Sequence, residues 1–228
     1  MNANEAQTRM QEIQRIMERA TLFTLLPGMP SVVGGLMVLA GCAASYAMFH
    51  SLDFADILHL SINGQIVFCV MWFVIGMGGI LLEVICTGRA AARQQVPPAH
   101  RPMRVAAFSL TPSVIVAMVL TVKFLLPFDP KIWEMLWTFN FNVPLEPKAE
   151  EIQYIVPVWM MLYGTGVYTA GLFSIRPPRV LGLTFLGMGV VALLCFPQYG
   201  VVSAALSFGL LHIVFGLYII HKQRQAVV

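Results

Sequence analysis

Six long apolar runs restrict what this chain can fold into more than any other feature. A helix needs about 20 apolar residues to cross the hydrocarbon core of a bilayer. By that measure the sequence predicts six spanning helices, at 31–50, 65–87, 105–126, 152–175, 180–196 and 200–221. Hydrophobic residues make up 58% of the 228 residues and charged residues only 11%, whereas a soluble domain has about 25% charged residues. The expected fold class is an all-α membrane protein.

Basic residues are distributed unequally between the two sides of the predicted spans. Eleven of the fourteen Lys and Arg residues precede the first span, follow the sixth, or lie between the second and third or the fourth and fifth. The other three are Lys123, Lys131 and Lys148. Because Lys and Arg are enriched in cytoplasmic loops, this distribution predicts that both termini face the cytoplasm.

Two segments outside the spans carry apolar residues in a helical pattern. In residues 1–26 this pattern predicts a cytoplasmic amphipathic helix that lies on the membrane surface or docks on a partner. The residues expected to make that contact are Met10, Ile13, Arg15, Met17 and Arg19. Residues 27–228 then form the six-helix transmembrane domain. Its outer loop, 128–151, is expected at the membrane interface, where aromatic side chains such as Trp133 and Trp137 prefer to lie.

Glycines recur along the spans at spacings that place them on one face of a helix. Lipid tails are as apolar as Leu, so helices in a bilayer associate through close backbone approach at small residues and through interhelical hydrogen bonds. The pattern therefore predicts helix packing at these glycines. They are Gly34, Gly41, Gly76, Gly79, Gly164, Gly171, Gly209 and Gly216.

Few ionisable residues lie inside the predicted spans, and such residues are the default candidates for a functional site. His212 lies near the middle of its span, whereas Glu83 lies about one helical turn from the end of its own. We expect His212, on a face shared with Gly209 and Gly216, to hydrogen-bond a hydroxyl or carbonyl of the span at 152–175. A proton relay, a haem ligand and a quinone-site donor are its alternative roles. The candidate intramembrane polar site consists of His212, Tyr163, Tyr168 and Glu83.

Sequence motifs for known chemistry are missing. The chain has no H-E-x-x-H, G-x-S-x-G, P-loop or strand-linked G-x-G-x-x-G pattern. Two-histidine haem ligation needs a second His at matching depth, and the other four lie at span ends or in loops. His50, Asp53, Asp56 and His59 share one outer segment, but their spacing does not form a metal-binding motif. We therefore expect no catalytic residue, no metal ligand and no cofactor bound by this chain alone.

Three stretches carry motifs in a recognisable order. They are QEIQRIMERATLFTLLPG before the first span, WMMLYGTGVYTAGLFSIRPPRVLG across the fourth and fifth, and SFGLLHIVFGLYIIHK in the sixth. Their order resembles an uncharacterised family of six-span bacterial integral membrane proteins with M-E-R-S-S-x-F-like, F-Y-G-like and G-F-G-x-L-H-I-x-Y-G-like motifs. This chain departs from that pattern at Ala20, Thr21 and Phe215. The resemblance implies a six-helix protein of the bacterial cytoplasmic (inner) membrane and no particular activity.

Helix-packing features outnumber chemical groups in this sequence. The leading hypothesis is a non-enzymatic accessory, sensory or regulatory subunit, whose partners are the lipid bilayer and other membrane subunits or a cytoplasmic protein. One alternative is a small-solute transporter or channel. Another is a subunit that borders a haem or quinone in a redox complex. Direct binding of nucleic acid is not expected.

Overall fold

The computed structural model describes residues 7, 9–10, 28–93, 101–125, 137–138, 149–172 and 176–225. Within these ranges most residues are helical and none lies in a strand. The elements are α2 (Gly28–Phe49), η1 (Phe54–His59), α3 (Ile62–Arg93), α4 (Arg101–Leu125), α6 (Ala149–Ile152), α7 (Ile155–Leu172), α8 (Arg176–Cys195), α9 (Gly200–Ala204), η2 (Ala205–Leu211) and α10 (His212–Gln225). η1 is a 3-10 helix, and η2 is a π-helix that joins α9 to α10 in one continuous rod.

Six helices in the described ranges are long and apolar enough to cross a membrane, which confirms the predicted number of spans. The α9–η2–α10 rod is the sixth of them. The predicted helix at 1–26 lies almost wholly outside the described residues, and of its expected contact residues only Met10 is described, with 64% of its surface exposed. The outer loop at 128–151 is likewise described only at Trp137, Thr138 and the beginning of α6. The described fold is that of a multi-pass helical membrane protein.

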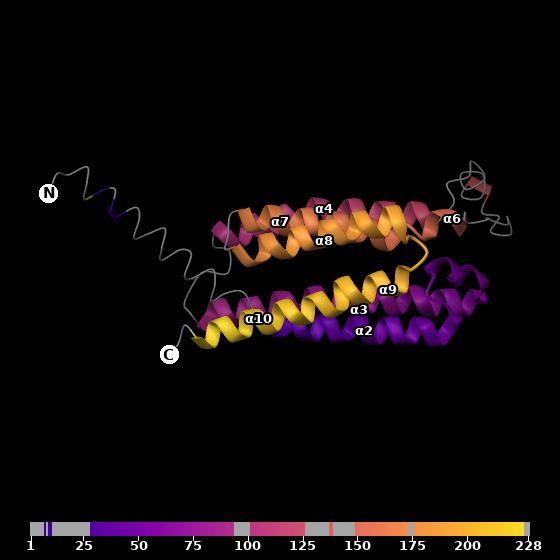
Figure 1. Cartoon of the computed structure of the whole chain (residues 1–228), viewed down its shortest axis with the longest axis horizontal. Coiled ribbons are helices and arrows are strands. Elements are labelled where there is room, and N and C mark those ends of the chain that lie inside the picture. The colour runs from indigo at the N-terminus through magenta and orange to yellow at the C-terminus, as the bar shows by residue number, and fades with distance from the viewer. Residues whose placement is uncertain are drawn as a thin grey trace.

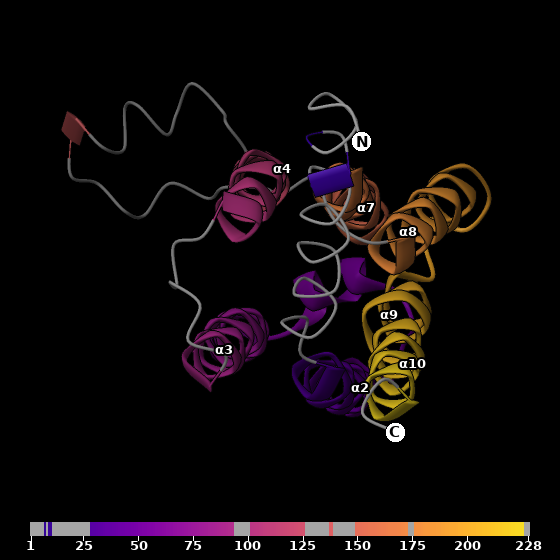
Figure 2. The same cartoon turned by 90° about the vertical axis from the view of Figure 1, so that its left-hand side faces the viewer.

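The six spans form two layers (Figure 1). One layer contains α4, α7 and α8, and the other contains α2, α3 and the α9–α10 rod. In the first layer α7 packs on both α8 and α4, and in the second α2 packs on both α10 and α3. The layers therefore group the third, fourth and fifth spans, and the first, second and sixth. α3 and α4 lie on the same side of the molecule but apart from each other (Figure 2).

Glycines on a seven-residue spacing bring the backbone of α2 into contact with the η2–α10 part of the sixth span. A Cβ atom placed on Gly35 would lie 2.5 Å from the carbonyl oxygen of Gly209, and one on Gly28 would lie 2.6 Å from that of Gly216. The contact is reciprocal, because a Cβ on Gly216 would lie 2.5 Å from the carbonyl oxygen of Gly28. Any larger residue would therefore force the two helices apart.

The other layer uses the same seven-residue spacing, with Gly164 and Gly171 on α7 and Gly182 and Gly189 on α8. A Cβ placed on Gly182 would lie 2.7 Å from the carbonyl oxygen of Gly164 and 2.5 Å from the backbone nitrogen of Tyr168. Each layer is thus built around one helix pair that is held at backbone contact.

A tryptophan attaches the third helix of each layer to this glycine-packed pair. The indole nitrogen of Trp72 on α3 donates to the hydroxyl of Ser45 on α2 at 3.2 Å. In the other layer the indole nitrogen of Trp159 on α7 donates to the hydroxyl of Thr121 on α4 at 2.7 Å. Interhelical hydrogen bonds of this kind stabilise helix association in lipid by about 0.6 kcal/mol on average.

Five of the eight glycines predicted at helix contacts lie against another helix: Gly41, Gly164, Gly171, Gly209 and Gly216. A Cβ placed on any of the other three, Gly34, Gly76 and Gly79, would meet no described atom within 4 Å. Gly35, the neighbour of Gly34, is the residue that packs against Gly209 of the sixth span. Adjacent residues point about 100° apart around a helix. The position of the sixth span therefore determines which of the two glycines, Gly34 or Gly35, lies at the contact.

The adjacent pair Gly34 and Gly35 provides a matched test of the backbone contact. We expect Gly35→Ala to lower the free energy of unfolding by about 1–3 kcal/mol, because the new methyl group meets the Gly209 carbonyl and the helices must separate. Gly34→Ala should raise the free energy of unfolding by about 1 kcal/mol at most, because Ala is the better helix former. Denaturant unfolding in detergent micelles measures both. Equal losses in the two variants would contradict the arrangement of α2 and α10.

Candidate functional site

A hydrogen bond between His212 and Tyr163 joins the two layers. The hydroxyl of Tyr163, on α7, lies 2.8 Å from Nε2 of His212, the first residue of α10. Phe185 of α8 and Phe208 of η2 enclose the pair, and the Phe185 ring centroid lies 4.9 Å from that of Tyr163 and 5.2 Å from that of His212. We call Tyr163, Phe185, Phe208 and His212 the central cluster. Tyr163 supplies the hydroxyl expected from the span at 152–175.

The π-helix η2 affects the direction in which His212 faces. A π-helix closes its hydrogen bonds over one residue more than an α-helix does, so the residues that follow are rotated. Gly209 and Gly216 contact α2, whereas His212 contacts Tyr163 of α7 and Phe185 of α8. The prediction that His212 shares one face with Gly209 and Gly216 is therefore wrong: the glycines face α2, and His212 faces α7 and α8. No residue type in η2 distinguishes it from an α-helix, so the sequence did not indicate this.

Neither nitrogen of the His212 ring is open to a ligand. Nε2 is bonded to Tyr163, and Nδ1 is buried without a hydrogen bond of good geometry. The backbone carbonyls of Ser207 and Phe208, about one turn earlier in the rod, face the imidazole. Because these acceptors favour an N–H group, we assign the hydrogen of the neutral ring to Nδ1, which makes Tyr163 the donor to Nε2. A haem iron could bind Nε2 only if the bond to Tyr163 broke.

Glu83, the acidic residue of the predicted polar site, lies on α3. α3 continues to Arg93, so Glu83 lies further from the helix end than the predicted span suggested. Its half-buried carboxylate accepts a hydrogen bond from the Thr87 side chain and interacts electrostatically with Tyr163. No described Lys or Arg side chain forms an ion pair with it. Of the four residues of the predicted polar site, the structure thus joins Tyr163 and His212 by a hydrogen bond, and Glu83 interacts with Tyr163 electrostatically.

Tyr168, the fourth predicted residue, faces elsewhere. It follows Tyr163 by five positions, which places it about 140° further around α7. Its backbone packs against Gly182 of α8. Both tyrosines belong to one predicted span, and only the rotation of α7 against its neighbours separates their roles. Tyr168 therefore serves as a natural comparison for Tyr163.

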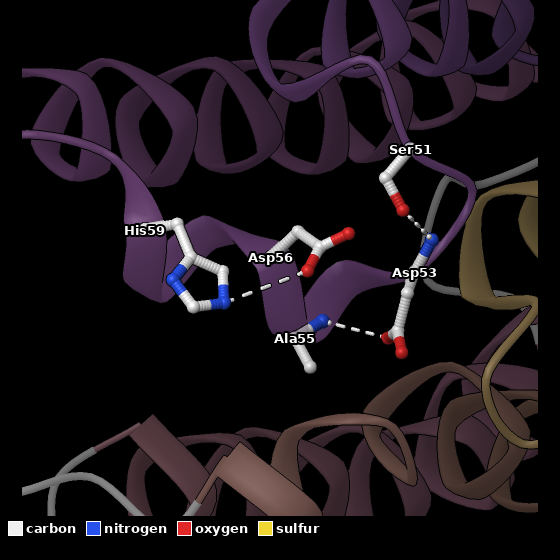
Figure 3. Close-up of polar contacts among 5 residues, drawn as sticks. All are labelled: Ser51, Asp53, Ala55, Asp56 and His59. Carbon is white, nitrogen blue, oxygen red and sulfur yellow. Dashed lines mark hydrogen bonds and ion pairs between the residues drawn. The ribbon is translucent and has the colours of Figure 1, made fainter.

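The segment between α2 and α3 forms a local cap at one end of the bundle (Figure 3). The Ser51 hydroxyl accepts from the backbone N–H of Asp53 at 3.1 Å, and the Asp53 carboxylate accepts from that of Ala55 at 2.8 Å. Nε2 of His59 lies 3.8 Å from Oδ1 of Asp56. In the described part of the chain no three His, Cys, Asp or Glu side chains gather as a metal site would require. The observed role of Asp53 is to cap η1.

The same segment ties this end of the bundle together. Phe54 is buried against Phe68 and Trp72 of α3, with ring centroids 5.5 Å from each. A Cβ on Gly200, where α9 begins, would lie 3.2 Å from the Phe54 ring. η1 also contacts α6, which leads into α7 of the other layer. The layers are therefore connected at this end as well as at the central cluster.

Asp53 should make the stability of this cap depend on pH. Burial raises the pKa of the Asp53 carboxyl, the charge of Asp56 raises it further, and the bond from Ala55 lowers it. Because the folded pKa exceeds the ordinary value, the folded state binds the proton more tightly, and the free energy of unfolding should fall as pH rises through the folded pKa. Asp53→Asn keeps the capping oxygen without the charge, so it should weaken this dependence and be at least as stable as the wild type at neutral pH.

Unfolding in detergent from about pH 4 to about pH 7 measures this effect. Asp53→Ala is the control, because it removes both charge and cap and should cost about 1 kcal/mol. An Asp53→Asn variant with an unchanged pH slope would show that the slope comes from other groups.

No protein family, curated protein or solved structure was found to match this chain. The similarity to six-span bacterial proteins noted in the sequence therefore stays a resemblance.

Proposed function

We propose that the protein is a non-enzymatic subunit of a larger membrane assembly, with an accessory, sensory or regulatory role. The observation that carries this proposal is the position of α3, which packs chiefly against α2 and η1 and leaves most of its surface uncovered. Exposed apolar side chains follow its length: Ile66, Val70, Phe73, Met77, Ile80 and Val84. Lipid or another helix must cover them.

Two glycines of α3 favour a helix as part of that covering. Gly76 and Gly79 are three residues apart, so they share a face of α3, and a Cβ on either would meet no described atom within 4 Å. Glycines of α2, α7, α8 and the η2–α10 part of the sixth span, there seven residues apart, lie against a neighbouring helix. In lipid such residues stabilise a structure mainly by letting another helix approach closely. We infer that this face of α3 receives a helix of a second chain.

The ends of the spans support an orientation for the proposed subunit. Basic side chains occur where α3 and α10 end and where α4 and α8 begin: Arg89, Arg93, Arg104, Arg176, Arg179, Lys222 and Arg224. The positive-inside rule places this end in the cytoplasm. We propose a bacterial inner membrane as the location and a cytoplasmic protein as a second class of partner at the basic end.

Photo-crosslinking from α3 in membranes of the native host tests the subunit proposal. A photoreactive amino acid at Ile80 on α3, 48% exposed, should give an adduct with one defined membrane protein. The same group at Val190 on α8, 42% exposed, should give lipid adducts. Replacement of both Gly76 and Gly79 by Leu should abolish the protein adduct from position 80, because the backbones can no longer meet.

Gly187→Leu provides the matched control, because Gly187 on α8 also faces open space. It should leave the adduct from position 80 unchanged. Equal protein adducts from positions 80 and 190, or an adduct that survives the double Leu replacement, would argue against a helix seated on α3.

A further inference from the structure

The sixth span changes its neighbours at its middle. Its first segment, α9, packs on both α2 and α7, whereas α10 packs chiefly on α2. Between them, η2 places Phe208 against Phe185 of α8, with ring centroids 5.0 Å apart, and His212 follows as the first residue of α10. In both views of the fold α10 lies further from α8 than α9 does (Figure 1 and Figure 2). The two layers therefore diverge from the central cluster toward the basic end.

The other connections between the layers lie at the end of the bundle where η1 lies, which we call the η1 end. There η1 contacts α6, and α7 contacts α9. Residues of both layers are buried in one core at this end: Ile152 and Val156 from one layer, and Val201 from the other. α8 and α9 are also joined here by a turn of four residues, in which the backbone N–H of Tyr199 donates to the Phe196 carbonyl at 3.1 Å. The η1 end thus holds the layers together closely.

The chain connects the layers less tightly at the basic end. α3 ends at Arg93 and α4 begins at Arg101, so the seven residues 94–100 separate them. A connection of that length permits a separation of up to about 24 Å. The layers can therefore move apart at the basic end without a break at the η1 end.

Each layer is stiffer internally than the connection between the layers at the central cluster. Within a layer, backbones touch at glycines such as Gly35 and Gly182, and an indole hydrogen bond fixes the third helix. At the central cluster the layers meet through side chains, namely the aromatic rings and the hydrogen bond between Tyr163 and His212. Loss of these side-chain contacts requires no rearrangement inside either layer.

We propose that the two layers move against each other as rigid units, with the hinge at the η1 end. The Tyr163–His212 bond holds the layers at the separation described above. When this bond breaks, the basic ends of the layers move further apart while the glycine contacts within each layer stay unchanged. The π-helix η2 lies where the sixth span leaves the other layer, and π-helical insertions are common sites of helix bending and of function. This motion belongs to the chain itself and goes beyond the proposed subunit role.

Distances between pairs of spin labels, measured by double electron–electron resonance on the full chain in lipid nanodiscs, test the hinge. The native cysteines are first replaced by Ala: Cys42, Cys69, Cys86 and Cys195. Labels at the exposed positions Leu183 of α8 and Leu217 of α10 report on the basic half of the molecule across the layers. We expect this pair to give two distances. Labels at Leu52 and Leu194, which span the layers at the η1 end, should give one narrow distance.

Removal of the bond between the layers should change the balance of the two distances. Tyr163→Phe should raise the ratio of the longer to the shorter distance for the pair 183–217 by about threefold, the effect of one hydrogen bond of average strength in a membrane. The pair 52–194 should keep its narrow distance in this variant. A third pair, Phe108 on α4 with Leu183, lies within one layer and should also stay unchanged, which shows that the layer remains folded.

Two control variants separate the hinge from a general loosening of the fold. Thr121→Val removes the partner of the Trp159 indole, a hydrogen bond of the same kind that lies inside one layer. Tyr168→Phe removes a hydroxyl from the same helix as Tyr163. Neither variant should alter the ratio for the pair 183–217. An unchanged distribution in Tyr163→Phe, an equal shift in Thr121→Val, or a spread as broad at 52–194 as at 183–217 would overturn the proposal.

Discussion

Backbone contact at glycine is the interaction on which the rest of this structure depends. Helices in lipid gain little from apolar burial, so a stable pair requires backbones close enough for extensive van der Waals contact. Gly28 and Gly35 meet Gly209 and Gly216 in one layer, and Gly164 meets Gly182 in the other. Each of these pairs supplies the surface on which a third helix is fixed by an indole hydrogen bond.

The central cluster depends on the sixth span, which packs its glycines against one layer and leaves another face free to contact the other layer. The rod places Gly209 and Gly216 against α2, and with one additional residue in η2 it still presents Phe208 and His212 to α7 and α8. One helix can then serve both layers. The connection between the layers rests on this cluster and on the contacts of η1 with α6 and of α7 with α9, whereas α3 and α4 remain apart (Figure 2).

The six spans could be predicted from the sequence because span length and hydropathy are local properties of the chain. The hydroxyl partner of His212 could also be predicted, since few polar side chains occur in the spans. The choice of Gly35 over Gly34, and of Tyr163 over Tyr168, could not be predicted, because each depends on how a helix is rotated against its neighbours. The length of α3 could not be predicted from hydropathy, because the helix continues past the apolar run at 65–87 to Arg93. The π-helix η2 has no signature in its residue types.

The surface of α3 proposed for a partner helix also includes an acidic residue. Gly76, Gly79 and Glu83 are separated by three and four residues, so they are neighbours along α3. A helix seated on the two glycines would lie close to Glu83 and would reduce its contact with water. Because a carboxylate within a membrane costs several kcal/mol unless it is paired, hydrated or protonated, such a partner would need a polar group near Glu83.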